Sequence, residues 1–232
     1  LVMTYGNDSP FSGCTSLESL TIESENFGSW FNNLTSIKDV YLGKEVTNIS
    51  SYSDSGFTGL TGLETIRVDA GNKVFDSRDN CCAVIETASN TLLQGCNTTT
   101  IPESVTAIGD GAFSGMIGIT ELILPASITN IGINAFYGCT ALQTINSYIE
   151  EPFDISAFDD ETKSTATLRV PFLTSMSYNY CSGWNFINIK ERDGSTEDMA
   201  IIEFTDPVAK LICVSNWDIN KDDEICVGEA KS

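Results

Sequence analysis

The chain repeats one spacing of apolar residues five times, and this repeat constrains its fold more than any other feature. The clearest copy starts at Phe113, which is followed by Gly, Met, Ile, Leu and Leu at offsets 2, 3, 6, 9 and 11. The other copies start at the anchor residues Phe11, Phe31, Phe57 and Phe136. A linking segment, I-P-E-S-V-T-A-I-G-D-G-A-F at 101–113, recurs as L-P-A-S-I-T-N-I-G-I-N-A-F at 124–136, a period of 23 residues. Such a period indicates a solenoid of stacked units.

Each unit contains a predicted short strand, because its L-x-x-I-x-V piece alternates apolar and polar residues. One short strand cannot bury its apolar edge alone, so the units are expected to stack on their neighbours. We predict an α/β repeat solenoid dominated by β structure. Its form should be a curved leucine-rich repeat with short parallel strands, a hairpin insertion and a C-terminal cap. The phenylalanine of each copy should stack on that of the next coil.

Two cysteines occupy an apolar position of the repeat. Cys14 and Cys139 stand at offset 3, where the other copies have Leu34, Leu60 and Met116. A position that accepts leucine, methionine or cysteine faces an apolar interior, because a free cysteine packs like a small hydrophobic residue. Both thiols are therefore predicted to be buried and free.

An insertion separates the third and fourth anchors, which lie 56 residues apart. It contains two apolar stretches, 83–85 and 91–93, around the turn-prone segment E-T-A-S-N, a pattern that predicts a β-hairpin. Three cysteines fall at its base: Cys81, Cys82 and Cys96. A bridge from either of the first two to the third remains open, and so do separate thiols. The spacing differs from the C-x-x-C pattern of zinc sites.

The repeat spacing changes after residue 145, where we expect the solenoid to end. Leu168–Val170 is predicted as the last strand, Pro171 as its stop and Ser175–Tyr180 as a short helix. The apolar cluster around Trp184 is interpreted as a cap, because a solenoid must cover its last open coil. The capped solenoid is assigned to residues 1–190.

The remaining residues are predicted to form an acidic linker over 191–199 and a helix with an EF-hand-like loop over 200–232. The sequence D-I-N-K-D-D-E-I-C-V-G-E at 218–229 places oxygen donors at the calcium-ligand positions of such a loop. The candidate metal ligands are Asp218, Asn220, Asp222, Glu224 and Glu229. Asp223 replaces the usual glycine, and a solvated acidic turn is the alternative. Calcium is the expected cofactor, and we expect the segment to be truncated before its exiting helix.

Composition excludes several classes of function. The chain has 12 Lys and Arg, 32 Asp and Glu and no His, for a formal net charge of −20. A surface this acidic repels phosphate backbones, so no nucleic-acid partner is expected. The lack of histidine excludes Ser-His-Asp catalysis and His-ligated zinc. The apolar runs are too short to span a membrane. The first ten residues lack a signal-peptide pattern, which suggests a mature or trimmed chain.

The A-F-x-G-C-x-x-L-x-x-I units and their P-x-S-V-T-x-I-G linkers resemble the BspA-like leucine-rich repeats of bacterial cell-surface proteins, notably those of gut anaerobes. The resemblance covers residues 10–190 and includes the insertion and the L-R-V-P…W-N-F-I-N-I ending. It implies a secreted or surface-anchored protein that binds a host extracellular protein or glycan.

A non-catalytic binding module is therefore the favoured function. The exposed strand positions lie at offset 10, and the candidate contact residues among them are Tyr41, Arg67 and Ile123. The alternative is a structural spacer or scaffold within a larger surface protein. An enzyme is not expected, because stacked coils rarely form a deep pocket and no catalytic motif is present.

Overall fold

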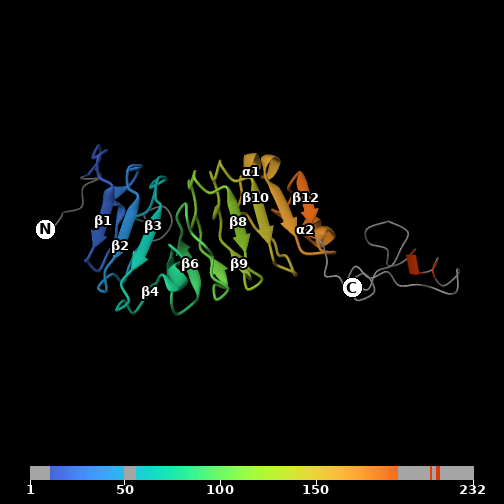
Figure 1. The fold of residues 1–232 in the computed structure, drawn as a ribbon, viewed down its shortest axis with the longest axis horizontal. Helices are drawn as coiled ribbons and strands as arrows, with labels where there is room; N and C mark the ends of the chain where they lie inside the picture. Colours follow the sequence, from blue (N-terminus) through green and yellow to red (C-terminus); the bar gives the residue numbers. More distant parts are fainter. Residues whose placement is uncertain (1–10, 50–55, 193–209, 211–212, 215–232) are drawn as a thin grey trace.

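The chain forms an elongated stack of coils (Figure 1). A computed structural model describes residues 11–49 and 56–192, together with 210, 213 and 214. Two parallel sheets run along this stack. The N-terminal sheet contains β1 (Ser19–Ile22), β2 (Asp39–Leu42) and β3 (Thr65–Val68). The C-terminal sheet contains, in spatial order, β8 (Glu121–Leu124), β10 (Thr144–Ser147), β11 (Thr167–Val170) and β12 (Asn188–Glu191).

The strand register follows the sequence repeat. Leu20 pairs with Val40, and Val40 pairs with Ile66. In the C-terminal sheet Leu122 pairs with Ile145. All five of these residues stand at offset 9 from their anchor phenylalanine, and all are buried. The predicted parallel, β-dominated repeat is thus confirmed, whereas its curvature stays a prediction.

A central sheet joins the other two along a different side of the coils. Its strands are β4 (Phe75–Asp76), β5 (Val84–Glu86), β6 (Thr91–Gln94), β7 (Ala107–Ile108) and β9 (Asn130–Ile131). The first three pair antiparallel, and the rest pair parallel. The antiparallel part is the insertion, and the short helix η2 (Arg78–Asn80) lies within it.

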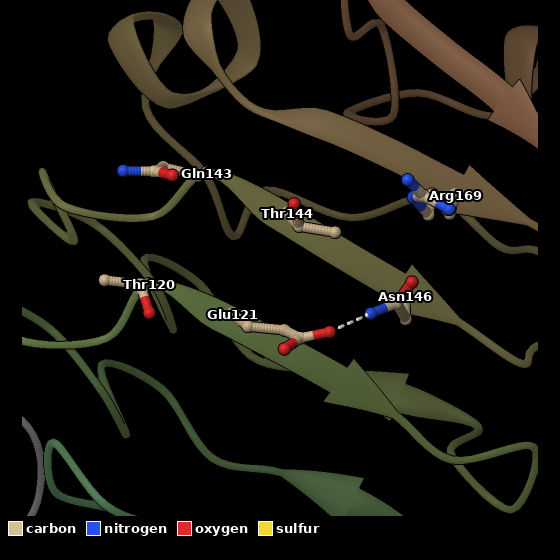
Figure 2. Close-up of a pocket in the computed structure, with 6 residues that line it drawn as sticks. All are labelled: Thr120, Glu121, Gln143, Thr144, Asn146 and Arg169. Atoms are coloured by element: carbon tan, nitrogen blue, oxygen red, sulfur yellow. Dashed lines mark hydrogen bonds between the residues drawn. The ribbon is translucent and has the colours of Figure 1, made fainter.

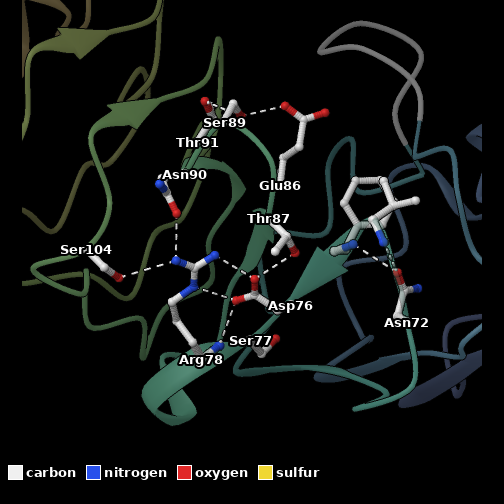
Figure 3. A network of polar contacts seen from close by, with 12 residues as sticks. Asn72, Asp76, Ser77, Arg78, Glu86, Thr87, Ser89, Asn90, Thr91 and Ser104 are labelled. Atoms are coloured by element: carbon white, nitrogen blue, oxygen red, sulfur yellow. Dashed lines mark hydrogen bonds and ion pairs between the residues drawn. The ribbon is translucent and has the colours of Figure 1, made fainter.

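Arg78 links the segments of this insertion to one another (Figure 3). Its Nε and Nη2 donate to the carboxylate of Asp76 at 2.7 and 2.6 Å, and its Nη1 donates to Asn90 at 2.7 Å. Thr87 also donates to Asp76, at 2.8 Å. Burial raises the pKa of Asp76, but the hydrogen bonds from Arg78 and Thr87 outweigh this effect and hold the pKa below its usual range. The network therefore favours an ionised Asp76 at neutral pH.

Asn72 joins the insertion to the preceding coil. Its Nδ2 donates to the carbonyls of Gly43 and Val46, at 2.9 and 2.8 Å. Its Oδ1 accepts from the backbone N–H groups of Val74 and Phe75, both at 2.9 Å (Figure 3). One side chain thus forms hydrogen bonds with four backbone groups. These groups lie where the chain changes from a parallel coil to an antiparallel hairpin, and this change would otherwise leave them unpaired.

Aromatic rings form a spine through the stack, as predicted. Phe136 is fully buried, and its ring stacks on Phe113 at 5.1 Å and on Phe158 at 5.0 Å. Phe11 and Phe31 stack at 4.6 Å. The repeat pattern did not identify three further buried rings. Phe27 lies between the anchors Phe31 and Phe57, with ring centres 6.2 and 4.8 Å away, and Phe158 and Trp184 extend the spine at its C-terminal end.

Two aromatic residues are buried at the C-terminal end. The indole of Trp184 is fully buried, donates to the carbonyl of Phe153 at 2.7 Å and meets the ring of Tyr178 edge-on at 5.0 Å. The Tyr178 hydroxyl donates to the carbonyl of Ile149 at 2.7 Å. Two short helices lie in this region, α1 (Asp160–Thr165) and α2 (Ser175–Tyr180).

The prediction that Leu168–Val170 is the last strand is wrong. The following strand, β12, pairs with β11 in parallel and covers its edge. The apolar cluster is also less buried than expected, because Ile187 is 74% exposed. The segment N-I-K-E at 188–191 contains only one apolar residue, so backbone pairing rather than side-chain burial places this strand.

The cysteine predictions have mixed outcomes. Cys139 is buried, and burial raises its pKa to about 12. The prediction that Cys14 is buried is wrong, because its side chain is exposed although Leu20 of the same coil is buried. The three cysteines of the insertion are free thiols, and the Sγ of Cys96 donates to the carbonyls of Glu64 and Cys82 at 3.1 and 3.2 Å.

Candidate binding face

The exposed side chains of the parallel strands line up in rows. Thr21, Tyr41 and Arg67 are in register across the N-terminal sheet. A corresponding row crosses the C-terminal sheet: Ile123, Asn146, Arg169 and Lys190. The structure therefore brings together two of the predicted contact residues, Tyr41 and Arg67, and places Ile123 on the other sheet.

Tyr41 and Arg67 are engaged with side chains of their own sheet. Arg67 donates to both carboxylate oxygens of Asp39, at 2.8 and 3.1 Å, and its guanidinium lies 6.0 Å from the centre of the Tyr41 ring. The Tyr41 hydroxyl donates to Asp69 at 2.5 Å. This hydrogen bond raises the pKa of Tyr41 and lowers the pKa of Asp69. The cation of this row, Arg67, is thus paired with a carboxylate of its own sheet.

The C-terminal sheet carries a shallow polar groove of about 420 Å³ (Figure 2). The groove is lined by Thr120, Glu121, Gln143, Thr144, Asn146 and Arg169. Glu121 accepts a hydrogen bond of 2.6 Å from the Nδ2 of Asn146, which leaves the Oδ1 of Asn146 to accept another. The side chains of Thr120, Gln143 and Thr144 make no hydrogen bond with any described residue. Hydroxyl and amide groups that have no hydrogen-bond partner among the described residues thus line the groove.

Two cations stand opposite each other beside this groove. Arg169 on β11 pairs in register with Lys190 on β12, and both side chains are exposed. Within the described part of the chain neither forms an ion pair. Like charges directly opposite each other destabilise a sheet. This positive spot is unusual in a chain whose formal net charge is −20.

A comparison of the two sheets explains why Arg169 has no carboxylate partner. Arg67 pairs with Asp39, which lies two residues before Tyr41, the register partner of Arg67. The residue two before Asn146, the register partner of Arg169, is Thr144. A threonine therefore stands where the N-terminal sheet has its neutralising carboxylate.

The repeat pattern missed Arg169 because the spacing changes in this coil. The spine ring of the coil is Phe158, and its strand residue Leu168, which pairs with Ile145, lies ten residues after it. In the earlier coils that distance is nine residues. Helix α1 occupies the interval. The A-F pair at 157–158, which matches those at 112–113 and 135–136, is the signal that would have corrected the spacing.

The predicted calcium ligands lie outside the described residues, as do positions 193–199 of the predicted linker. Of the helix predicted before the loop, the structure describes only Lys210, Cys213 and Val214, all three helical. No group of three or more acidic or cysteine side chains suited to a metal ion occurs among the residues that the structure describes. Within the same residues, no helix has the length and apolar character needed to cross a membrane.

Comparisons with known proteins agree with this fold. The chain matches the family described as "BspA type Leucine rich repeat region", in six copies over residues 3–81 and 86–197. No curated protein matches it significantly.

Three solved structures are similar to it. A leucine-rich repeat protein from Eubacterium ventriosum is 23% identical, with 58% of this chain and 42% of that chain covered and a TM-score of 0.41. A leucine-rich cell surface protein from Faecalibacterium prausnitzii is 18% identical, with coverages of 81% and 63% and a TM-score of 0.46. The pneumococcal vaccine antigen PcpA is 17% identical, with coverages of 78% and 61% and a TM-score of 0.33. The chain thus spans between 42% and 63% of the length of these proteins.

The family match extends over more than half of the chain and coincides with the coils, their register and the aromatic spine. This protein belongs to the family of BspA-type leucine-rich repeat proteins.

Proposed function

We propose that this chain is a non-catalytic, secreted or cell-surface binding module that recognises a host extracellular protein or glycan through the exposed face of its C-terminal sheet. The observation that carries the proposal is the groove beside two cations, Arg169 and Lys190, that have no ion-pair partner among the described residues. Four of its six lining residues, namely Glu121, Thr144, Asn146 and Arg169, stand on strands, which hold side chains more rigidly than loops do.

The chemistry of the groove supports binding rather than catalysis. Glu121 is the carboxylate that lines it, and this group is already hydrogen-bonded to Asn146. Glycoside hydrolysis usually requires two carboxyl groups on either side of the bond that is cleaved. The chain also has no histidine to serve as a general base near neutral pH.

Filling the groove tests this function. The chain should bind saturably to at least one member of a panel of immobilised extracellular-matrix proteins and glycans, measured by biolayer interferometry. Thr144→Tyr should lower this binding at least tenfold, because the larger side chain occupies the groove. Thr65→Tyr makes the same exchange at the equivalent position of the N-terminal sheet and should leave binding unchanged. A panel without saturable binding, or an equal loss in both variants, would contradict the proposal.

A structural spacer is the second candidate, and the N-terminal sheet favours it. Its Arg67 is paired with Asp39, and its Tyr41 hydroxyl is engaged by Asp69, so neither predicted contact residue has its polar group available. Attachment of the whole surface protein that survives deletion of residues 1–190 would support the spacer and contradict the binding module.

We also propose that the acidic loop at 218–229 binds calcium, on the strength of its ligand spacing alone. Calorimetric titration of the chain should give a Kd of about 10⁻⁴–10⁻³ M, the range of extracellular modules of this kind. Asp218→Asn and Glu229→Gln should each weaken binding, because each removes a charged ligand. Titrations that do not differ between the chain and these variants would favour a solvated acidic turn.

A further inference from the structure

We propose that the groove of the C-terminal sheet binds an acidic oligosaccharide, whose single carboxylate or sulfate lies against Arg169 and Lys190 while its hydroxyls hydrogen-bond to the groove. This inference rests on the proposed function and names the class of ligand for the same site. It depends on three observations: the unpaired cations, the unused hydrogen-bonding groups and the lack of an apolar anchor in the lining.

The two cations are available to an anion from outside the sheet. Arg169 and Lys190 are directly opposite each other and repel, and the described residues supply no carboxylate to either. The equivalent cation on the N-terminal sheet, Arg67, has Asp39. A planar guanidinium can donate two parallel hydrogen bonds to a carboxylate or sulfate, and the neighbouring ammonium adds a second charge. A bound anion would form an ion pair with Arg169, as Asp39 does with Arg67 on the other sheet.

The rest of the lining suits hydroxyl groups. Thr120 and Thr144 offer hydroxyls, Gln143 offers an amide, and none of these side chains hydrogen-bonds to another described residue. The Oδ1 of Asn146 is available because its Nδ2 is held by Glu121 (Figure 2). Hydroxyls and amides both donate and accept, which matches the hydroxyls of a sugar ring.

The lining argues against a protein partner at this groove. Protein interfaces gain most of their binding energy from aromatic and arginine anchors in desolvated pockets. No aromatic residue lines this groove, and its only arginine is exposed. The net charge of −20 also disfavours polyanions such as heavily sulfated chains, because the rest of the surface repels them. A ligand with one negative charge and many hydroxyls suits a polar lining without aromatic anchors and is repelled less by the acidic surface than a polyanion.

A matched pair of sugars tests the inference. We expect 3′-sialyllactose to bind the chain in NMR titrations and neutral lactose to bind at least tenfold more weakly. Arg169→Gln should lower the affinity for 3′-sialyllactose at least tenfold, and Arg169→Lys should restore part of it by returning the charge. Arg67→Gln removes the equivalent cation of the other sheet and should change nothing. Both arginines are exposed, so thermal melts should show that the variants stay folded.

Other outcomes separate this inference from the proposed function. Equal binding of lactose and 3′-sialyllactose, or an unchanged affinity in Arg169→Gln, overturns the acidic ligand but leaves a glycan-binding module. Binding of an acidic peptide without binding of 3′-sialyllactose, lactose 3′-sulfate or a uronic acid disaccharide overturns the glycan and leaves a protein partner. The proposed function itself fails if the panel of proteins and glycans also shows no saturable binding, or if Thr144→Tyr and its control variant lose binding equally.

Discussion

Phe136→Ala is expected to lower the free energy of unfolding by about 3–5 kcal/mol, the usual cost of removing a fully buried ring. Phe136 stacks on Phe113 and on Phe158, so the loss weakens the contacts with the coils on both sides. In a solenoid, stability is the sum of terms within coils and terms between neighbouring coils. A change that weakens two interfaces should therefore lower the melting temperature by roughly 6–20 °C.

The adjacent residue provides the control for Phe136. Tyr137 is 53% exposed, and Tyr137→Ala should change the free energy of unfolding by no more than about 0.5 kcal/mol. Urea denaturation followed by circular dichroism measures both variants. Similar losses in the two would contradict the role assigned to the aromatic spine.

Trp184→Ala is expected to cost a similar amount, about 3–5 kcal/mol, but at one end of the stack. The substitution leaves a cavity beside Tyr178 and Phe158 and removes the donor to the carbonyl of Phe153. Because each coil contacts only its neighbours, the loss should be local. Hydrogen exchange should accelerate in β11 and β12 and stay unchanged in β1 to β3.

Two further variants separate packing from hydrogen bonding at this end. Trp184→Phe keeps a buried ring but leaves the Phe153 carbonyl unpaired, which should cost about 1–3 kcal/mol. Tyr180 is 82% exposed, and Tyr180→Ala should leave exchange in β11 and β12 unchanged. Faster exchange throughout the stack in Trp184→Ala would show that the coils unfold as one unit and would contradict a local cap.

The repeat pattern predicts the interior of this protein well, because stacking forces every coil to bury the same positions. Offset 9 lies in the buried register and the anchor phenylalanines form the spine, as expected. Cys14 shows where this reasoning fails, since it is exposed although Leu20 of the same coil is buried. Strand β12 shows a second failure, because backbone hydrogen bonds can place a strand that has little apolar pattern.

The exposed face was harder to predict, since no packing requirement governs it. The pattern identified Tyr41 and Arg67 as exposed, but their hydrogen bonds to Asp69 and Asp39 depend on side chains from neighbouring strands. The importance of Arg169 could not be derived from its own coil either. Arg169 has no carboxylate partner because the neighbouring strand has Thr144 at the position where the N-terminal sheet has Asp39.

The stacking of one strand per coil has a mechanical consequence. Strands β1 and β12 lie at opposite ends of the stack, so tension between them pulls across the backbone hydrogen bonds (Figure 1). The hydrogen bonds between neighbouring strands then break in sequence, one coil at a time. A released coil of 23 residues extends to about 80 Å, against roughly 4.8 Å while folded. Under flow or shear the protein would lengthen in steps and act as an extensible tether whose coils unfold one after another.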